Sequence, residues 1–113
     1  MTPAVFNFKD LKYGGWFTGI QMDLTKVINE VESALDLTGA TIVLEVKKSS
    51  TSFVSKAFTI GYGITVLDAI NGSINIDEFE VTLSPYKYIY TFKITLSGGV
   101  EKTYLEGLFE VYQ

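Results

Sequence analysis

An all-β domain, built as an antiparallel β-sandwich of two sheets with an immunoglobulin-like or jelly-roll-like strand order, is the fold that the sequence predicts. The first observation is the alternation of apolar and polar residues, which is typical of strands with one face on a core. The second is that such segments recur about every ten residues, separated by glycine and asparagine turns. The third is a length of 113 residues with 47% hydrophobic side chains, which suits one domain covering residues 1–113.

Residues 88–96 form the clearest expected strand, because apolar and polar side chains alternate along the whole segment. One face carries Tyr88, Tyr90, Phe92, Ile94 and Leu96, and the other carries Ile89, Thr91, Lys93 and Thr95. Gly98 and Gly99 then supply the positive φ angles of a tight hairpin turn, so the chain is expected to return antiparallel through residues 102–105. Gly107 has no side chain and permits a bulge or bend, after which residues 108–112 are expected to form a last edge strand.

The other strands are expected upstream of this hairpin. Residues 40–48 alternate, with Ile42, Leu44 and Val46 directed inward. Shorter expected strands are residues 6–9, 16–24, 53–59, 64–67, 73–76 and 79–83. A segment near residues 25–36 breaks the pattern, because its apolar residues fall at helical spacing. One short helix or wrapped connection is therefore expected there.

Composition excludes several classes of function. The formal net charge is -4 and the lysines are scattered, so no basic face is available to neutralise nucleic-acid phosphates. The chain has no histidine and no cysteine, which excludes Ser-His-Asp and Cys-His catalytic sites and thiolate metal sites. The first ten residues lack the basic and apolar regions of a secretory signal, and no apolar run is long enough for a membrane-spanning helix. We expect a soluble protein made inside the cell, with no cofactor, no nucleic-acid partner and no membrane partner.

Carboxylates are the remaining candidates for chemistry. Asp68, Asp77, Glu78 and Glu80 could form a glycosidase-like pair or a calcium site, but their spacing matches no ligand pattern. They are interpreted as turn and exposed strand residues. The glycines at 61 and 63 lack the third glycine and the strand-to-helix context of a dinucleotide site, and are interpreted as a turn. The protein is therefore expected not to be an enzyme.

Aromatic side chains offer a second kind of site. Most are expected to fill the space between sheets, as buried aromatics do in small sandwiches. Trp16, Tyr62 and Tyr86 could instead stack against sugar rings, because aromatic faces pack on the apolar patches of such ligands. Together with Tyr112 at the end of the last strand, they are the candidate interaction residues.

Three stretches resemble small phage tail and baseplate proteins, notably the N-terminal β-sandwich domain of upper baseplate proteins from phages of Gram-positive hosts. They are residues 35–42, with Leu37-Thr38-Gly39 leading into a strand, residues 61–76 with their glycine and asparagine turns, and residues 83–111. Together they cover about the C-terminal two-thirds of the chain. The sequence departs from the pattern at Tyr86-Lys87, where the family has a glycine before its tyrosine, and at residues 25–36, which look like an insertion.

The resemblance implies a non-enzymatic structural protein of a phage or prophage tail, made in the bacterial cytoplasm and located in the virion. It would assemble with other tail or baseplate proteins as a homo- or hetero-oligomer. Strand edges suit this role, because unpaired main-chain groups can bond to a partner strand. The expected edges are residues 6–9 and 108–112. The alternative is a carbohydrate-binding module in which the exposed aromatic residues contact glycans.

Overall fold

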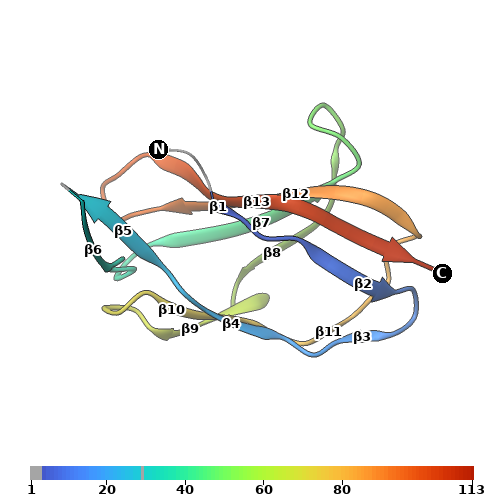
Figure 1. The fold of residues 1–113 in the computed structure, drawn as a ribbon, viewed down its shortest axis with the longest axis horizontal. Helices are drawn as coiled ribbons and strands as arrows, with labels where there is room; N and C mark the ends of the chain where they lie inside the picture. Colours follow the sequence, from blue (N-terminus) through green and yellow to red (C-terminus); the bar gives the residue numbers. More distant parts are fainter. Residues whose placement is uncertain (1–3, 29) are drawn as a thin grey trace.

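The computed structural model describes residues 4–28 and 30–113, and every regular element within them is a β-strand (Figure 1). The strands are β1 (Ala4–Val5), β2 (Phe8–Lys12), β3 (Trp16–Phe17), β4 (Ile20–Asp23), β5 (Thr25–Ile28), β6 (Val31–Ala34), β7 (Thr41–Lys47), β8 (Val54–Ile60), β9 (Gly63–Asp68), β10 (Ser73–Ile76), β11 (Phe79–Glu80), β12 (Tyr86–Thr95) and β13 (Glu101–Tyr112). The all-β prediction is confirmed.

The main sheet has nine strands in the order β1-β13-β12-β7-β8-β9-β10-β4, with β2 also pairing with β13. It curls on itself, so that β13, β12 and β7 lie in the upper layer of Figure 1 and β9, β10 and β4 in the lower layer. β1 and β2 run parallel to β13, and β8 runs parallel to β9, which makes the sheet mixed. Two small sheets, β3 with β11 and β5 with β6, complete the described chain. The two layers thus come largely from one curled mixed sheet, whereas two separate antiparallel sheets were expected.

The turn between β8 and β9 carries the chain from one layer to the other. Gly61 and Gly63 have φ angles of 86° and 101°, in the region that side chains other than glycine rarely adopt. A Cβ on Gly63 would lie 2.3 Å from the Phe58 ring, so glycine also allows a core aromatic to pack against the turn. The curl of the sheet therefore depends on two glycines of this segment.

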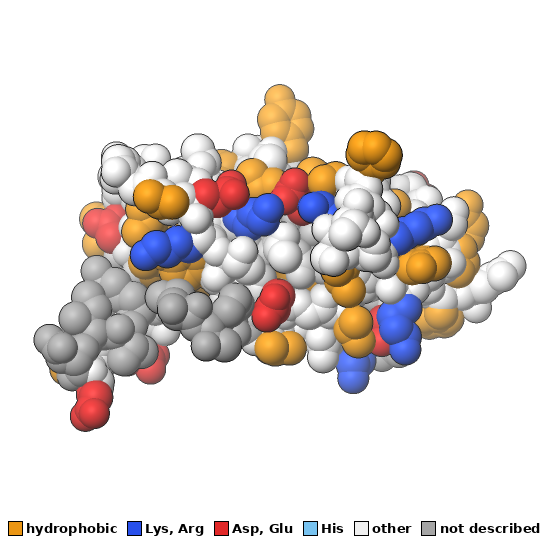
Figure 2. Space-filling view, turned by 90° about the horizontal axis from the view of Figure 1, so that it is seen from above, with side chains coloured by type: hydrophobic (Ala, Val, Ile, Leu, Met, Phe, Trp, Pro, Cys, Tyr) orange, Lys and Arg blue, Asp and Glu red, His pale blue; other side chains and the backbone are white. Residues whose placement is uncertain are grey.

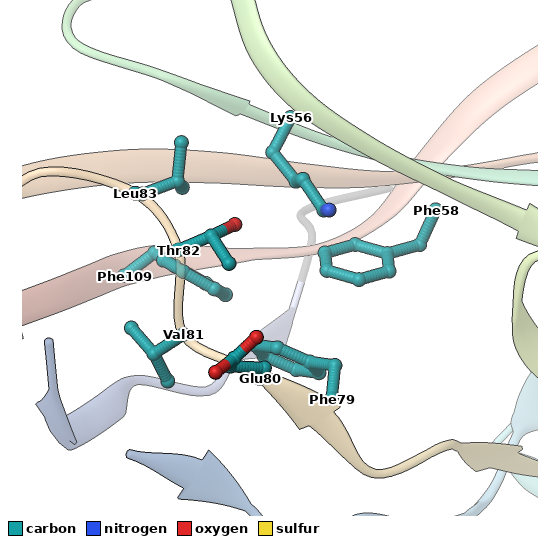
Figure 3. A pocket seen from close by; sticks show the side chains of 8 residues that line it. All are labelled: Lys56, Phe58, Phe79, Glu80, Val81, Thr82, Leu83 and Phe109. Carbon is teal, nitrogen blue, oxygen red and sulfur yellow. The ribbon is translucent and has the colours of Figure 1, made fainter. Parts of the chain in front are cut away.

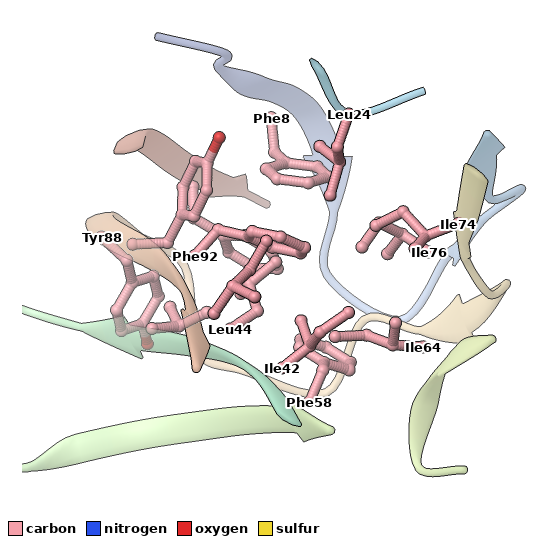
Figure 4. Close-up of a cluster of buried hydrophobic side chains, with 14 of the residues drawn as sticks. Phe8, Leu24, Ile42, Leu44, Phe58, Ile64, Ile74, Ile76, Tyr88 and Phe92 are labelled. Atoms are coloured by element: carbon pink, nitrogen blue, oxygen red, sulfur yellow. The ribbon is translucent and has the colours of Figure 1, made fainter. Parts of the chain in front are cut away.

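Alternation builds the core between the layers. On β12 the buried side chains are Tyr88, Tyr90, Phe92 and Ile94, and on β7 they are Ile42, Leu44 and Val46, as expected from the sequence. They meet Ile64, Ile74 and Ile76 from the lower layer (Figure 4). Full burial of each such side chain contributes about 1.5–3 kcal/mol relative to exposure. The hairpin turn at Gly98 and Gly99 is also confirmed, with Gly98 at a φ of 71°.

Phe8 on β2 lies at the centre of an aromatic cluster. Its ring centroid lies 5.0 Å from that of Tyr90, 5.4 Å from that of Phe109 and 5.6 Å from that of Phe17. The Tyr90 hydroxyl donates a hydrogen bond to the main-chain oxygen of Phe6, and burial raises the pKa of Tyr90 well above its ordinary value. The N-terminal strands are thereby attached to the middle of the sheet.

The helix expected near residues 25–36 is wrong, and the segment forms the β5–β6 hairpin. A helix with this spacing would place Val31 and Leu35 on one apolar stripe against the core. In the structure Leu35 is buried but Val31 is 65% exposed. β-branched residues such as Thr25 and Val31 are stiff at χ1 and favour strands over helix, which explains the outcome. Residue 29 of this segment lies outside the described residues.

The expected short edge strand at residues 108–112 is also wrong, because residues 101–112 form one continuous strand, β13. β13 lies between β12 and the pair β1 and β2, so it is no edge of the sheet. A Cβ on Gly107 would lie 2.3 Å from the Phe6 oxygen and 2.7 Å from Asn7 Oδ1. The register shifts against β12 between Phe92 and Lys93 and against β2 between Phe109 and Val111, and neither shift lies at Gly107. Gly107 therefore allows close approach of the N-terminal chain within a continuous strand, and does not separate two strands.

The expected edge at residues 6–9 is only partly an edge. Phe8 pairs in parallel register with Phe109, and the main chain of Phe6 and the side chain of Asn7 bond to Glu106 and Leu108 of β13. In the described chain, one side of this segment is therefore occupied by β13. The other short expected strands are present, although residues 79–83 contribute only the two residues of β11, and residues 16–24 divide into β3 and β4.

Candidate functional site

The outer face of β7, β12 and β13, which points away from the core, contains an open groove of about 480 Å³. Its lining residues are Val5, Asn7, Ser50, Ile89, Tyr90, Thr91, Glu106, Gly107 and Leu108. An adjoining hollow of about 120 Å³ shares Ser50, Ile89, Tyr90 and Thr91 and adds Glu45, Lys47 and Lys93. We call the two together the outer groove.

Strand register explains which side chains form the floor of the outer groove. Ile89 pairs with Lys47 on β7 and with Leu108 on β13, and directly opposed residues share one face of a sheet. In the next row, Thr91 pairs with Glu106, and Val5 of β1 continues that row. The floor therefore has an apolar part, Val5, Ile89 and Leu108 from three strands, beside the polar Thr91 and Glu106.

The wall on the β7 side comes from the loop between β7 and β8. The Ser52 main-chain N–H donates to the Ser49 oxygen at 3.1 Å, and the hydroxyls of the same two residues lie 2.7 Å apart. These bonds close a compact turn that holds Ser50 at the groove. This loop is the one that stands above the upper layer in Figure 1.

An ion pair lines the smaller hollow of the outer groove. Lys93 Nζ lies 2.8 Å from Glu45 Oε1, with both side chains about three-quarters buried. The hydrogen bond to Glu45 is the main cause that raises the pKa of Lys93 above its ordinary value. Lys93 therefore stays charged through neutral pH, which suits a structural contact better than proton transfer.

The seam between the two layers contains a much smaller crevice (Figure 3). Phe58, Phe79 and Phe109 lie deep in it, with Lys56 and Glu80 among the lining side chains. Its volume is about 10 Å³, which is room for about one water molecule. The crevice is thus a packing gap beside the aromatic core, and the outer groove is the larger candidate site.

Three of the four aromatic residues predicted from the sequence lie at one end of the molecule, on the right in Figure 1. Trp16 lies on β3, Tyr86 begins β12 and Tyr112 ends β13, and all three are exposed. Tyr13, which the sequence did not single out, joins them, because its N–H donates to the Tyr112 oxygen at 2.8 Å. We call these four residues the aromatic end. Tyr62 is exposed in the turn between β8 and β9, outside the aromatic end.

The carboxylates that the sequence raised as alternatives are engaged in local contacts. Asp68 accepts a hydrogen bond of 2.7 Å from the Asn71 side-chain amide, and Asp77 accepts one of 2.9 Å from the Thr65 hydroxyl. Among the described residues, no group of three or more acidic, histidine or cysteine side chains could hold a metal ion. These two residues act as turn and strand contacts, as interpreted.

The outer groove was missed because the alternating pattern assigned its residues to the wet face. In the sequence, Ile89 stands among polar residues on the outer face of residues 88–96, and Leu108 and Val5 lie far from it in the chain. The available signal was an apolar residue at a position where the pattern favours a polar one. Only the pairing of β12 with β13 and of β13 with β1 shows that these residues meet.

Comparison of the chain with protein-family models, with curated proteins and with solved structures found no match. The resemblance to baseplate proteins stays a prediction. In the part of the chain that the structure describes, no helix is long and apolar enough to cross a membrane.

Proposed function

We propose that this protein is a non-catalytic docking module that holds an extended segment of a partner protein in the outer groove. The supporting observation is the apolar part of the floor, Val5, Ile89 and Leu108, on a sheet face that points away from the core. Apolar side chains that line a concave surface contribute binding free energy when a partner removes them from water. The module would thus serve protein–protein assembly.

Charges on either side of the floor define the chemistry of the partner. Lys47 lies on the β7 side of the outer groove and Glu106 on the β13 side. A segment with an apolar side chain over Ile89, a carboxylate toward Lys47 and a basic group toward Glu106 matches both charges. An extended segment fits best, because its alternate side chains point to one face.

The chemistry of the groove supports a role without catalysis. Its ionisable side chains include Glu45 and Lys93, which form an ion pair, and its uncharged polar groups include Ser50 and Thr91. The protein has no histidine to serve as a base beside either hydroxyl.

A phage or prophage tail or baseplate is the setting that the sequence resemblance implies for such a module. In that setting the partners are other virion proteins in a homo- or hetero-oligomer. Genes for portal, tape-measure or tail-fibre proteins beside this one would support the setting, and polysaccharide-degrading neighbours would favour the alternative of glycan binding. The docking role itself does not depend on the setting.

Selection from a displayed random peptide library against the purified protein tests the docking role. We expect enriched peptides with apolar residues at alternate positions. The double variant Ile89→Lys and Leu108→Lys should weaken their binding by about tenfold or more, because it places charges on the floor of the outer groove.

Thr95→Lys is the matched control, because Thr95 lies further along β12, outside the outer groove. This control should bind the same peptides as the unchanged protein, and thermal unfolding should show that all variants are folded. Equal binding by the Ile89/Leu108 variant, or no enrichment at all, would rule out the groove as the docking site.

A further inference from the structure

The aromatic end is also a basic end. Lys12 pairs in register with Tyr112, and Lys48 Nζ lies 5.2 Å from the centre of the Tyr86 ring. Lys87 follows Tyr86 on β12. Of the side chains that the structure describes, the charged ones at and near this end are Lys9, Lys12, Lys48 and Lys87, against Glu80 and Glu110. Among these described side chains, lysines therefore outnumber carboxylates around the exposed rings.

The opposite end of the molecule, which we call the acidic end, consists of the β5–β6 hairpin and the turns at residues 68–72 and 96–100. Main-chain hydrogen bonds of 2.8 Å join Leu24 to Gly72 and Leu37 to Ala69. Of the side chains that the structure describes, the charged ones at this end are Asp23, Glu30, Glu32, Asp36, Asp68 and Glu101, against Lys102. Its exposed aliphatic residues are Val31, Ile70 and Val100.

β7 and β12 connect the two ends. Thr41 pairs with Thr95 next to the acidic end, and Lys47 pairs with Ile89 toward the aromatic end. The two pairs are separated by about 20 Å of strand, and the longest extent of the molecule is 44 Å. Figure 2 shows most of the blue side chains in the half that contains the aromatic end and most of the red ones in the other half and the centre. The ends are thus opposite in position and in charge.

We propose that the protein associates with a second copy of itself head to tail, the aromatic end of one copy docking on the acidic end of the next. Lys48 and Lys87 would face carboxylates such as Glu32, and the rings would cover the exposed aliphatic residues. This inference deepens the proposed role in assembly by naming a partner, but it uses surfaces other than the outer groove.

Charge complementarity is the reason for this occupant and this arrangement. Pairing two aromatic ends would bring lysines together, and pairing two acidic ends would bring carboxylates together, both of which cost free energy. A contact between unlike patches leaves one free patch of each kind, so it can repeat along a row of subunits or close into a ring. The structure therefore favours a repeating assembly over a two-fold dimer.

Sedimentation velocity of the full chain, over a range of concentration and salt, tests the proposal. The unchanged protein should grow in size with concentration and shrink at high salt. The variants Lys48→Glu/Lys87→Glu and Glu32→Lys/Glu101→Lys should each weaken self-association by about tenfold or more. An equimolar mixture of the two should associate again, because each retains the end that the other has lost.

The groove variant Ile89→Lys/Leu108→Lys is the control and should self-associate like the unchanged protein. This control separates the two proposals. Peptide binding in the outer groove can be absent while the ends associate, and self-association can be absent while the groove binds peptides. A protein that stays monomeric up to millimolar concentration, or a mixture of end variants that stays monomeric, would overturn the inference. So would a glycan array on which the aromatic end binds sugar while self-association is absent.

Discussion

Replacing Phe8 by alanine is expected to lower the free energy of unfolding by about 3–5 kcal/mol. Phe8 is 2% exposed and its ring meets those of Tyr90, Phe109 and Phe17, so the change removes buried area and leaves a cavity. The neighbouring rings come from β12, β13 and β3, which limits how far they can move to fill the space. Urea unfolding followed by circular dichroism measures the loss.

Phe53→Ala is the matched control, because Phe53 is 96% exposed in the loop before β8. Its replacement should change the free energy of unfolding by about 0.5 kcal/mol or less. Equal losses for the two variants would mean that Phe8 is not held in the aromatic cluster and that β2 is poorly attached to the sheet.

Replacing Gly72 by alanine is expected to lower the free energy of unfolding by about 2–5 kcal/mol, from two separate causes. Gly72 has a φ of 69°, which is unfavourable for any residue with a side chain. An added Cβ would also lie 2.5 Å from the Leu24 oxygen and 2.6 Å from the Leu35 oxygen. Since both atoms belong to the main chain, relief requires movement of the segments that support the β5–β6 hairpin. The midpoint of thermal unfolding should fall accordingly.

Gly98→Ala separates the two causes. Gly98 has nearly the same φ, 71°, but a Cβ there would meet nothing within 4 Å. Its replacement by alanine should lower the free energy of unfolding only by the cost of a positive φ, about 1–2 kcal/mol. If the two alanine variants unfold at the same midpoint, the crowding around Gly72 contributes nothing to stability.

The sequence predicts well what depends on neighbouring residues. The alternation from Tyr88 to Ile94, the inward face of Ile42 and Leu44, and the turn at Gly98 all appear in the structure. In each case a period of two and a turn residue are enough to place the strand, whatever it pairs with. The same local rule identified Trp16, Tyr86 and Tyr112 as aromatic candidates without showing that they share an end.

What the sequence could not predict depends on residues far apart in the chain. Whether Val31 packs inward is decided by the partners of its segment, and the apolar spacing alone favoured a helix over residues 25–36. Gly107 suggests a bend because it has no side chain. The actual reason for glycine there is its close contact with Phe6, about a hundred positions earlier in the chain, which the sequence does not reveal. The outer groove likewise exists only once Ile89, Leu108 and Val5 are brought together by pairing.

The pairing of β1 and β2 with β13 has a consequence for biosynthesis. The Leu108 N–H donates to the side chain of Asn7 across a separation of 101 residues. β1 and β2 therefore cannot pair until β13 has been made. A chain made only as far as β12 would keep Phe8 exposed, because its partner Phe109 lies on β13. Closing so long a loop is entropically costly and slow. Folding of this sheet is therefore completed only after β13 has been made, and a chain truncated before β13 would expose an aromatic residue to chaperones and proteases.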